Sequence, residues 1–145
     1  MSDEAADIVD WALFEKSRAE LGPGFIRILS YFREDGTKSV AQIETAMRQE
    51  NTAGLVIPAH TLKGEARQFG AEPLAEVAEL IETTARFCIE SRRFPDELVT
   101  DVVKLRRLFE DTIELFDKAT NPLLTRARVG AFGRKSAANQ DFGRI

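Results

Sequence analysis

Cysteine and histidine are nearly absent from this chain of 145 residues, which contains one of each, Cys88 and His60. A single cysteine cannot form an internal disulfide. One cysteine and one histidine also cannot supply the usual ligand set of a structural zinc site. The sequence therefore predicts a protein without a disulfide and without a metal site of its own.

Long apolar runs are also missing, as is a basic segment at the start of the chain. A membrane-spanning helix needs roughly 20 consecutive apolar residues, and a secretory signal needs a basic start followed by an apolar stretch. The first ten residues, MSDEAADIVD, are acidic instead. We therefore expect a cytoplasmic protein that does not contact a membrane.

Acidic residues outnumber basic ones, 24 to 20, and the charge is unevenly distributed. Residues 120–145 hold five basic residues against Asp141 alone, so the overall charge of −4 leaves residues 1–119 at −8. Binding to nucleic acid needs clustered Lys and Arg, so an acidic body argues against that partner. We expect one domain over residues 1–119, followed by a basic, solvated tail over residues 120–145.

Apolar residues recur at spacings of three and four along almost the whole chain, and no segment has the alternation of a strand. Glycine and proline separate the periodic segments. The predicted helices lie at about residues 7–21, 25–49, 58–70, 72–94 and 98–121. Helical structure before Pro58 is left open, because a proline either occupies the first turn or kinks an interior. Four long amphipathic helices after a short one favour an all-α, antiparallel four-helix bundle with an extra N-terminal helix.

His60 lies on the third predicted helix, and its direction decides whether it is a core residue or a surface residue. At about 100° per residue, Leu55, Leu62 and Phe69 fall near 180–220° from the histidine. The apolar face of this helix is therefore opposite His60, and we expect the imidazole to face solvent.

Lys63, Gly64 and Arg67 share the histidine face, within about 60° of His60. A neutral imidazole offers a nucleophilic nitrogen, and neighbouring cations stabilise the charge that builds during phosphoryl transfer. Gly64 is a poor helix former at an exposed interior position, which indicates that something approaches the backbone closely there. An ordinary solvated face has the same kinds of residue, so direction alone leaves both interpretations open.

Three further residues on this face are candidates for contacts with a partner or a phosphate. Val56 and Ile57 lie near −40° and +60° from His60, where exposed apolar side chains are unfavourable without a partner. We expect both to belong to a docking patch. Gln68, at about +80°, is in position to hydrogen-bond near the imidazole, although a solvated glutamine is the simpler interpretation.

The run AHTLKGEARQFGAEPLAEVAELIE, residues 59–82, resembles the signature of histidine phosphotransfer (HPt) domains. In that signature an alanine and a histidine precede x-L-K-G, and a second glycine follows six residues after the first. His60, Lys63, Gly64 and Gly70 all match it. The resemblance implies a four-helix bundle with a solvent-exposed phosphoacceptor histidine near the middle of one helix.

The resemblance also implies a role for each matching residue. His60 becomes the phosphorylated residue, Lys63 its neighbouring cation, and Gly64 the position that leaves room for a receiver domain. Arg67 departs from the family pattern, which commonly has a small residue there. Its long cation is a candidate for binding the phosphoryl group or for selecting a partner.

HPt domains neither bind ATP nor phosphorylate themselves, which agrees with the lack of a Gly-rich phosphate loop in this chain. The implied partners are receiver domains, one in a hybrid histidine kinase and one in a response regulator. Mg²⁺ is expected on the receiver, so this chain would need no cofactor. Because the sequence has no sustained heptad seam, we expect a monomer.

Two other function classes were weighed against phosphotransfer. A helical adaptor would bind a response regulator without carrying phosphate, but it has no need of an exposed imidazole beside Lys63 and Gly64. A histidine kinase would need a nucleotide-binding domain for which this chain is too short, and a phosphatase would need groups that position water. The sequence therefore favours a phosphohistidine carrier that is not itself a kinase.

Overall fold

The computed structural model describes residues 8–121. Capping residues and glycines determine where the helices begin and end. Helix α2, Trp11–Leu21, begins after Asp10, whose carboxylate accepts hydrogen bonds from the N–H groups of Ala12 and Leu13. The predicted helix over residues 7–21 is not continuous, because Val9 and Asp10 are outside any helix and Asp10 is the extended N-cap of α2. Residue 7 itself lies outside the described residues.

Four long helices follow α2, with short 3₁₀ turns between several of them. The long helices are α3 (Phe25–Arg48), α4 (Val56–Gln68), α5 (Glu72–Glu90) and α6 (Val99–Thr120), and the 3₁₀ turns are η1 (Gly22–Gly24), η2 (Ala53–Leu55) and η3 (Asp96–Leu98). No strand occurs among residues 8–121, so the predicted all-α fold is confirmed. None of the helices in this part of the chain combines the length and the apolar character needed to cross a membrane.

Proline and glycine set the ends of α4, the helix that carries His60. Pro58 lies in its first turn, where the missing N–H has no intrahelical partner to lose. Gly70 follows the helix with φ of +82°, and its carbonyl accepts a 2.8 Å hydrogen bond from the N–H of Asp10. A Cβ at this position would lie 2.6 Å from the Asp10 carbonyl oxygen, so glycine is required.

Helix α5 is shorter than predicted. It ends at Glu90, and Arg92 then adopts a left-handed φ of 56°, which lets the N–H of Arg93 bond back to the carbonyl of Cys88 at 2.9 Å. A helix can close in this way without glycine at a cost of about 1 kcal/mol, which sequence periodicity does not reveal.

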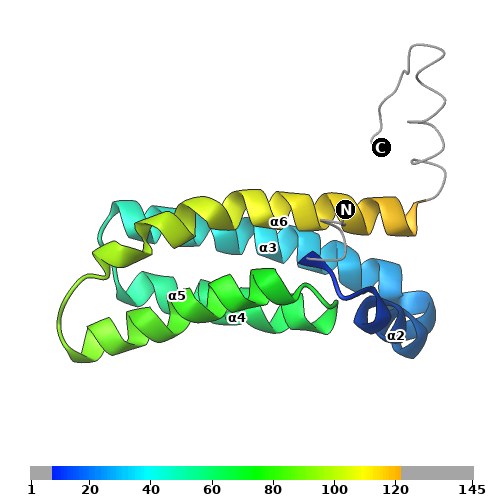
Figure 1. Cartoon of the computed structure of the whole chain (residues 1–145), viewed down its shortest axis with the longest axis horizontal. Coiled ribbons are helices and arrows are strands. Elements are labelled where there is room, and N and C mark those ends of the chain that lie inside the picture. Colours follow the sequence, from blue (N-terminus) through cyan, green and yellow to red (C-terminus); the bar gives the residue numbers. More distant parts are fainter. Residues whose placement is uncertain (1–7, 122–145) are drawn as a thin grey trace, which may run out of the picture. The chain divides into compact units, whose positions relative to one another are not determined.

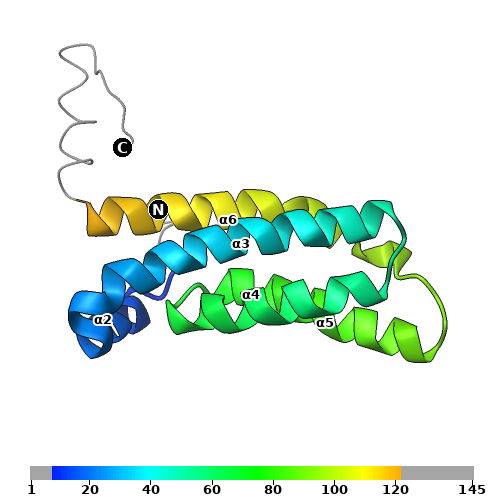
Figure 2. The ribbon, with the colours of Figure 1, turned by 180° about the vertical axis from the view of Figure 1, so that it is seen from behind.

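The long helices pack in an antiparallel bundle (Figure 1), in which α4 lies against both α5 and α3. In both views α3 also runs beside the first part of α6, and α2 lies near the start of α3 (Figure 2). Burying one apolar stripe from each helix is what stabilises such a bundle. His60 therefore lies on an outer face of a helix whose opposite face belongs to the core.

Much of the core is a chain of aromatic rings. Successive ring centroids lie 5.3 Å apart for Phe14 and Phe25, 5.7 Å for Phe25 and Phe69, and 5.5 Å for Phe69 and Phe32. Phe32 then meets Phe109 of α6 at 5.8 Å. Most of these contacts are edge-to-face, a geometry that adds to the hydrophobic gain of burial. Phe69 directly follows α4, so its contacts with Phe25 and Phe32 hold the C-terminal end of α4 in place.

Gly36 has a packing role in this bundle. It is buried in the middle of α3, and a Cβ there would overlap the ring of Phe109. The cost of a glycine inside a helix is therefore offset by the close approach of α6.

The chain divides into two units, residues 1–113 and residues 114–145. The described part of the second unit is the end of α6 and Asn121. The predicted boundary after residue 119 stays a prediction. The predicted basic tail falls almost entirely on residues 122–145, which lie outside the described residues.

Candidate functional site

His60 projects from the middle of α4, and its side chain is 58% exposed, as the helical periodicity predicts. Its Nδ1 atom lies 3.0 Å from Oε2 of Glu82, which comes from α5. The imidazole is therefore open to a partner while one of its two nitrogens is held by the neighbouring helix.

Glu82 is almost fully buried, and three side chains surround its carboxylate. Lys63 Nζ lies 2.9 Å from Oε1, whereas Oε2 accepts hydrogen bonds from Nε of Arg86 at 3.0 Å and from the His60 ring. Burial alone would raise the pKa of Glu82, but the hydrogen bonds from Lys63, Arg86 and His60 outweigh it and lower the pKa to about 2. Glu82 is thus ionised at neutral pH. We call Glu82, His60, Lys63 and Arg86 the Glu82 cluster.

The ionised carboxylate decides which imidazole tautomer is present. An ionised carboxylate can only accept hydrogen bonds, so Nδ1 of His60 must donate. This hydrogen bond assigns the tautomer of the neutral ring, which has its proton on Nδ1 and its lone pair on Nε2. Nε2 is therefore the nucleophilic atom of the site.

Lys63 lies where the resemblance implies, one turn after His60, but its first partner is a carboxylate. Its side chain is only 20% exposed and pairs with Glu82. A buried carboxylate without such a partner would be strongly unfavourable. Lys63 therefore neutralises the group that orients the imidazole, and it contributes positive potential to the site from a partly buried position.

Gly64 leaves open space beside His60. It is exposed, and a Cβ added to it would meet no heavy atom of its described surroundings within 4 Å. The packing of the domain therefore does not require glycine here, in contrast to Gly36 and Gly70.

The structure brings Arg67 together with two carboxylates. Its Nη2 lies 2.6 Å from Glu79 and its Nε 3.4 Å from Glu72, both on α5. Any contact with a phosphoryl group on His60 would compete with these ion pairs. Gln68 is exposed, in agreement with the simpler interpretation of a solvated glutamine, and the hydrogen bond at Nδ1 of the imidazole is made with Glu82.

Val56 and Ile57, both predicted to be exposed, differ in the structure. Ile57 is 67% exposed, but Val56 is only 7% exposed and belongs to the core. The ideal helical periodicity fails at Val56 because it is the first residue of α4, next to the η2 turn that packs on α3 and α5. Only Ile57 remains a candidate for the docking patch.

Sequence reasoning missed Glu82 and Arg86. The signal for Glu82 was present, because it follows Ile81 and lies one turn after Ala78 and one turn before Ala85, all of them buried. A carboxylate inside an apolar stripe needs partners, and those partners are usually functional or structural cations. Arg86 then follows at the helical spacing of four, where it reaches the same carboxylate.

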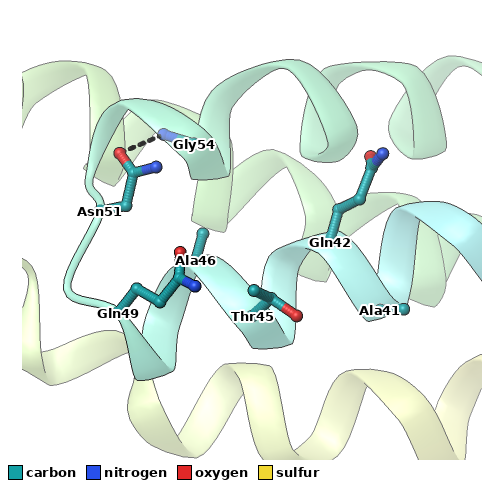
Figure 3. Close-up of a pocket in the computed structure, with 7 residues that line it drawn as sticks. All are labelled: Ala41, Gln42, Thr45, Ala46, Gln49, Asn51 and Gly54. Carbon is teal, nitrogen blue, oxygen red and sulfur yellow. Dashed lines mark hydrogen bonds between the residues drawn. The ribbon is translucent and has the colours of Figure 1, made fainter.

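Two hollows on the surface lie away from this cluster. One, of about 270 Å³, lies where α3 meets the η2 turn and is lined by amide and small side chains (Figure 3), with the Gly54 N–H donating to Asn51. Another, of about 380 Å³, lies between α3 and α6 and is mostly apolar. Neither hollow is lined by a histidine. Among the described residues, no three His, Cys, Asp or Glu side chains gather in the manner of a metal site.

Comparison with known proteins shows the family to which this chain belongs. A family model described as the Hpt domain matches residues 27–118, which include α4 and α5. Among solved structures, the chain is similar to histidine-containing phosphotransfer protein B (HptB) from Pseudomonas aeruginosa PAO1, with a TM-score of 0.68 and 20% sequence identity. The alignment covers 79% of this chain and 95% of that one. The comparison with curated proteins gave no match. The exposed histidine on a four-helix bundle and the match of the family model together show that the chain belongs to the Hpt family of histidine phosphotransfer proteins, which interact with receiver domains in phosphorelays.

Proposed function

We propose that this protein carries a phosphoryl group on Nε2 of His60, receiving it from an aspartyl phosphate of one receiver domain and passing it to the aspartate of another. The observation that carries this proposal is the 3.0 Å contact between Nδ1 of His60 and the ionised Glu82, on an imidazole that is 58% exposed. One nitrogen is fixed as a donor, and the other is left as the acceptor of the phosphoryl group.

Glu82 also has a role in the transfer step. When the lone pair of Nε2 forms the N–P bond, the P–O bond to the receiver's aspartate breaks and its electrons leave with the carboxylate. The imidazole becomes positively charged because the proton stays on Nδ1. Glu82 stabilises that charge, and because it keeps the proton on Nδ1, the ring leaves as neutral imidazole in the reverse transfer.

The partners differ in what they bring to this reaction. We propose that the receiver of a hybrid histidine kinase donates and the receiver of a response regulator accepts, with Mg²⁺ bound to the receiver in each case. This chain would supply the nucleophile and the docking surface, with no kinase activity and no cofactor of its own. We further propose that it acts as a monomer in the cytoplasm.

The test is phosphotransfer from a phosphorylated receiver domain to the purified protein and to its His60→Gln variant, followed as acid-labile, base-stable phosphate. Label on the wild type and none on the variant is the expected result. Incubation with ATP alone is the control for kinase activity, and we expect no label there. If several phosphorylated receivers label neither protein, phosphotransfer is refuted and the adaptor alternative replaces it.

A further inference from the structure

Arg86 is a member of the Glu82 cluster that the family signature does not contain. It lies on α5, and its Nε and Nη2 atoms lie 3.0 and 2.9 Å from Oε2 of Glu82. Its side chain is 55% exposed, so the guanidinium reaches the surface beside the imidazole.

Arg86 and His60 bind the same carboxylate oxygen. Because each makes a hydrogen bond to Oε2 of Glu82, the nearest guanidinium nitrogen and Nδ1 of His60 are separated by no more than about 6 Å, two hydrogen-bond lengths. A guanidinium has five N–H donors, and Glu82 engages Nε and Nη2. Donors therefore remain for a second anion.

The other two cations on this side of the molecule are less suited to a phosphoryl group. Lys63 is only 20% exposed and lies on Oε1 of Glu82, the oxygen that does not contact His60. Arg67 is held by two carboxylates of α5. Of these three cations, Arg86 is the one that is exposed and also hydrogen-bonds the Glu82 oxygen that His60 contacts.

We propose that Arg86 binds the phosphoryl group carried by His60 and links it to Glu82. The inference rests on the function proposed above and adds a specific residue to it. Arg86 supplies positive charge only, and no bond to it forms or breaks. Because the contact exists only in the phosphorylated protein, Arg86 shifts the balance of transfer toward phosphohistidine and away from the receiver's aspartyl phosphate.

The test compares wild type with Arg86→Gln and Arg86→Lys, each phosphorylated on His60 by the small donor phosphoramidate so that receiver docking is not needed. The readout is a ³¹P NMR titration of the phosphoryl group. A bound guanidinium favours the dianion, so we expect the phosphoryl pKa to rise by about half a unit or more in Arg86→Gln and less in Arg86→Lys, which keeps a point charge. With one receiver as partner, the transfer equilibrium of Arg86→Gln should shift about tenfold toward the receiver, which is the expected size for one charge-assisted hydrogen bond.

Arg107→Gln is the matched control, because Arg107 is 81% exposed on α6 and pairs with Asp111 in a surface ion pair. It removes the same charge away from the cluster, and we expect no change in either readout. If the Arg86→Gln titration and equilibrium match those of Arg107→Gln, Arg86 only positions Glu82 and the proposal is overturned. If wild type takes no phosphoryl group from phosphoramidate or from any receiver, the proposed function fails, and this inference fails with it.

Discussion

A histidine on a helix surface has two ring nitrogens that differ only when a neighbour distinguishes them. In this chain the neighbour is Glu82, buried beneath the ring and held ionised by Lys63 and Arg86. The exposure of His60 follows from its position on α4, but its reactivity depends on a carboxylate from another helix. The chemistry of the site is therefore a property of four side chains rather than one.

Replacing Glu82 with Gln should slow phosphoryl transfer to His60 about tenfold or more, since a hydrogen bond to a charged group is worth about 1.5–3 kcal/mol. The amide can still accept from Nδ1, but it cannot stabilise the positive ring. Transfer rates from one receiver at saturating concentration measure the effect. Glu76→Gln is the control, because Glu76 is exposed on the same helix and lies outside the Glu82 cluster. Equal rates for the two variants would exclude a role for Glu82 in the transfer step.

Replacing Gly64 with Ala should leave the fold intact and stabilise it by up to about 1 kcal/mol, the helix-propensity difference between the two residues. A Cβ at Gly64 has open space within the described domain, so any loss of transfer must come from a clash with the partner. We expect slower transfer from receivers and unchanged phosphorylation by phosphoramidate. Urea unfolding and the two labelling assays measure these effects. A loss of stability would show that Gly64 serves the fold instead.

Val56 and Ile57 form a matched pair for the docking patch, adjacent in sequence but 7% and 67% exposed. Ile57→Asp should change stability by no more than about 0.5 kcal/mol and slow transfer from a receiver. Val56→Asp should destabilise the domain by about 3 kcal/mol or more, because it buries a charge. Chemical denaturation combined with transfer kinetics separates the two. Normal transfer by a folded Ile57→Asp variant would remove Ile57 from the patch.

At the scale of the elements, α4 meets α3 through two acidic side chains. Asp35 of α3 acts on the carboxyl group of Glu65 of α4, whose Oε1 is buried with no hydrogen-bond partner among the described residues. Burial, followed by the charge and hydrogen bond of Asp35, raises the pKa of Glu65 to about 7. The packing of α3 on α4 is thus most favourable when Glu65 is protonated.

The sign of the resulting pH dependence follows from linkage. Since the folded pKa of Glu65 is about 7 and the usual value is 4.5, the folded state binds more protons between these values. The stabilisation is full below pH 4.5 and is lost as the pH rises through about 7. Glu65→Gln should remove this loss, which we place on the order of 1 kcal/mol because solvent screens a partly exposed group.

Urea unfolding of wild type and Glu65→Gln at pH 5 and pH 8 tests the prediction, with Glu34→Gln on the exposed side of α3 as the control. The difference in stability between the two pH values should be smaller in Glu65→Gln than in the other two proteins. Equal differences in all three would contradict the raised pKa of Glu65.

Among residues 8–121, the order and number of the α-helices from α2 to α6 could be predicted from sequence, because apolar spacing and the breaks at Gly22 and Gly70 are local signals. The sequence was less informative where contacts between helices decide the burial of a residue or the end of a helix. The burial of Val56 depends on the η2 turn packing against two other helices, and the early end of α5 depends on Arg92 taking a left-handed conformation. Glu82 and Arg67 show the same limit for the site, since their partners come from a different helix.

At the scale of the whole molecule, the bundle lets two helices share one site. Helix α4 supplies the nucleophile and the open backbone at Gly64, and α5 supplies the buried carboxylate and Arg86. The aromatic chain through Phe25, Phe69 and Phe32 holds the end of α4 against its neighbours. The proposed chemistry and the proposed docking patch therefore lie on one outer face, while the core fixes the distance between the two helices.

The central claim is that Nε2 of His60 carries the phosphoryl group while Nδ1 donates to Glu82. The most direct measurement is ¹⁵N and ³¹P NMR of the protein labelled with ¹⁵N-histidine, before and after phosphorylation. The chain contains a single histidine, so one imidazole gives all the signals. The account predicts a protonated Nδ1 in both states and coupling of ³¹P to Nε2 alone. Coupling to Nδ1, or a neutral ring protonated on Nε2 before transfer, would contradict it.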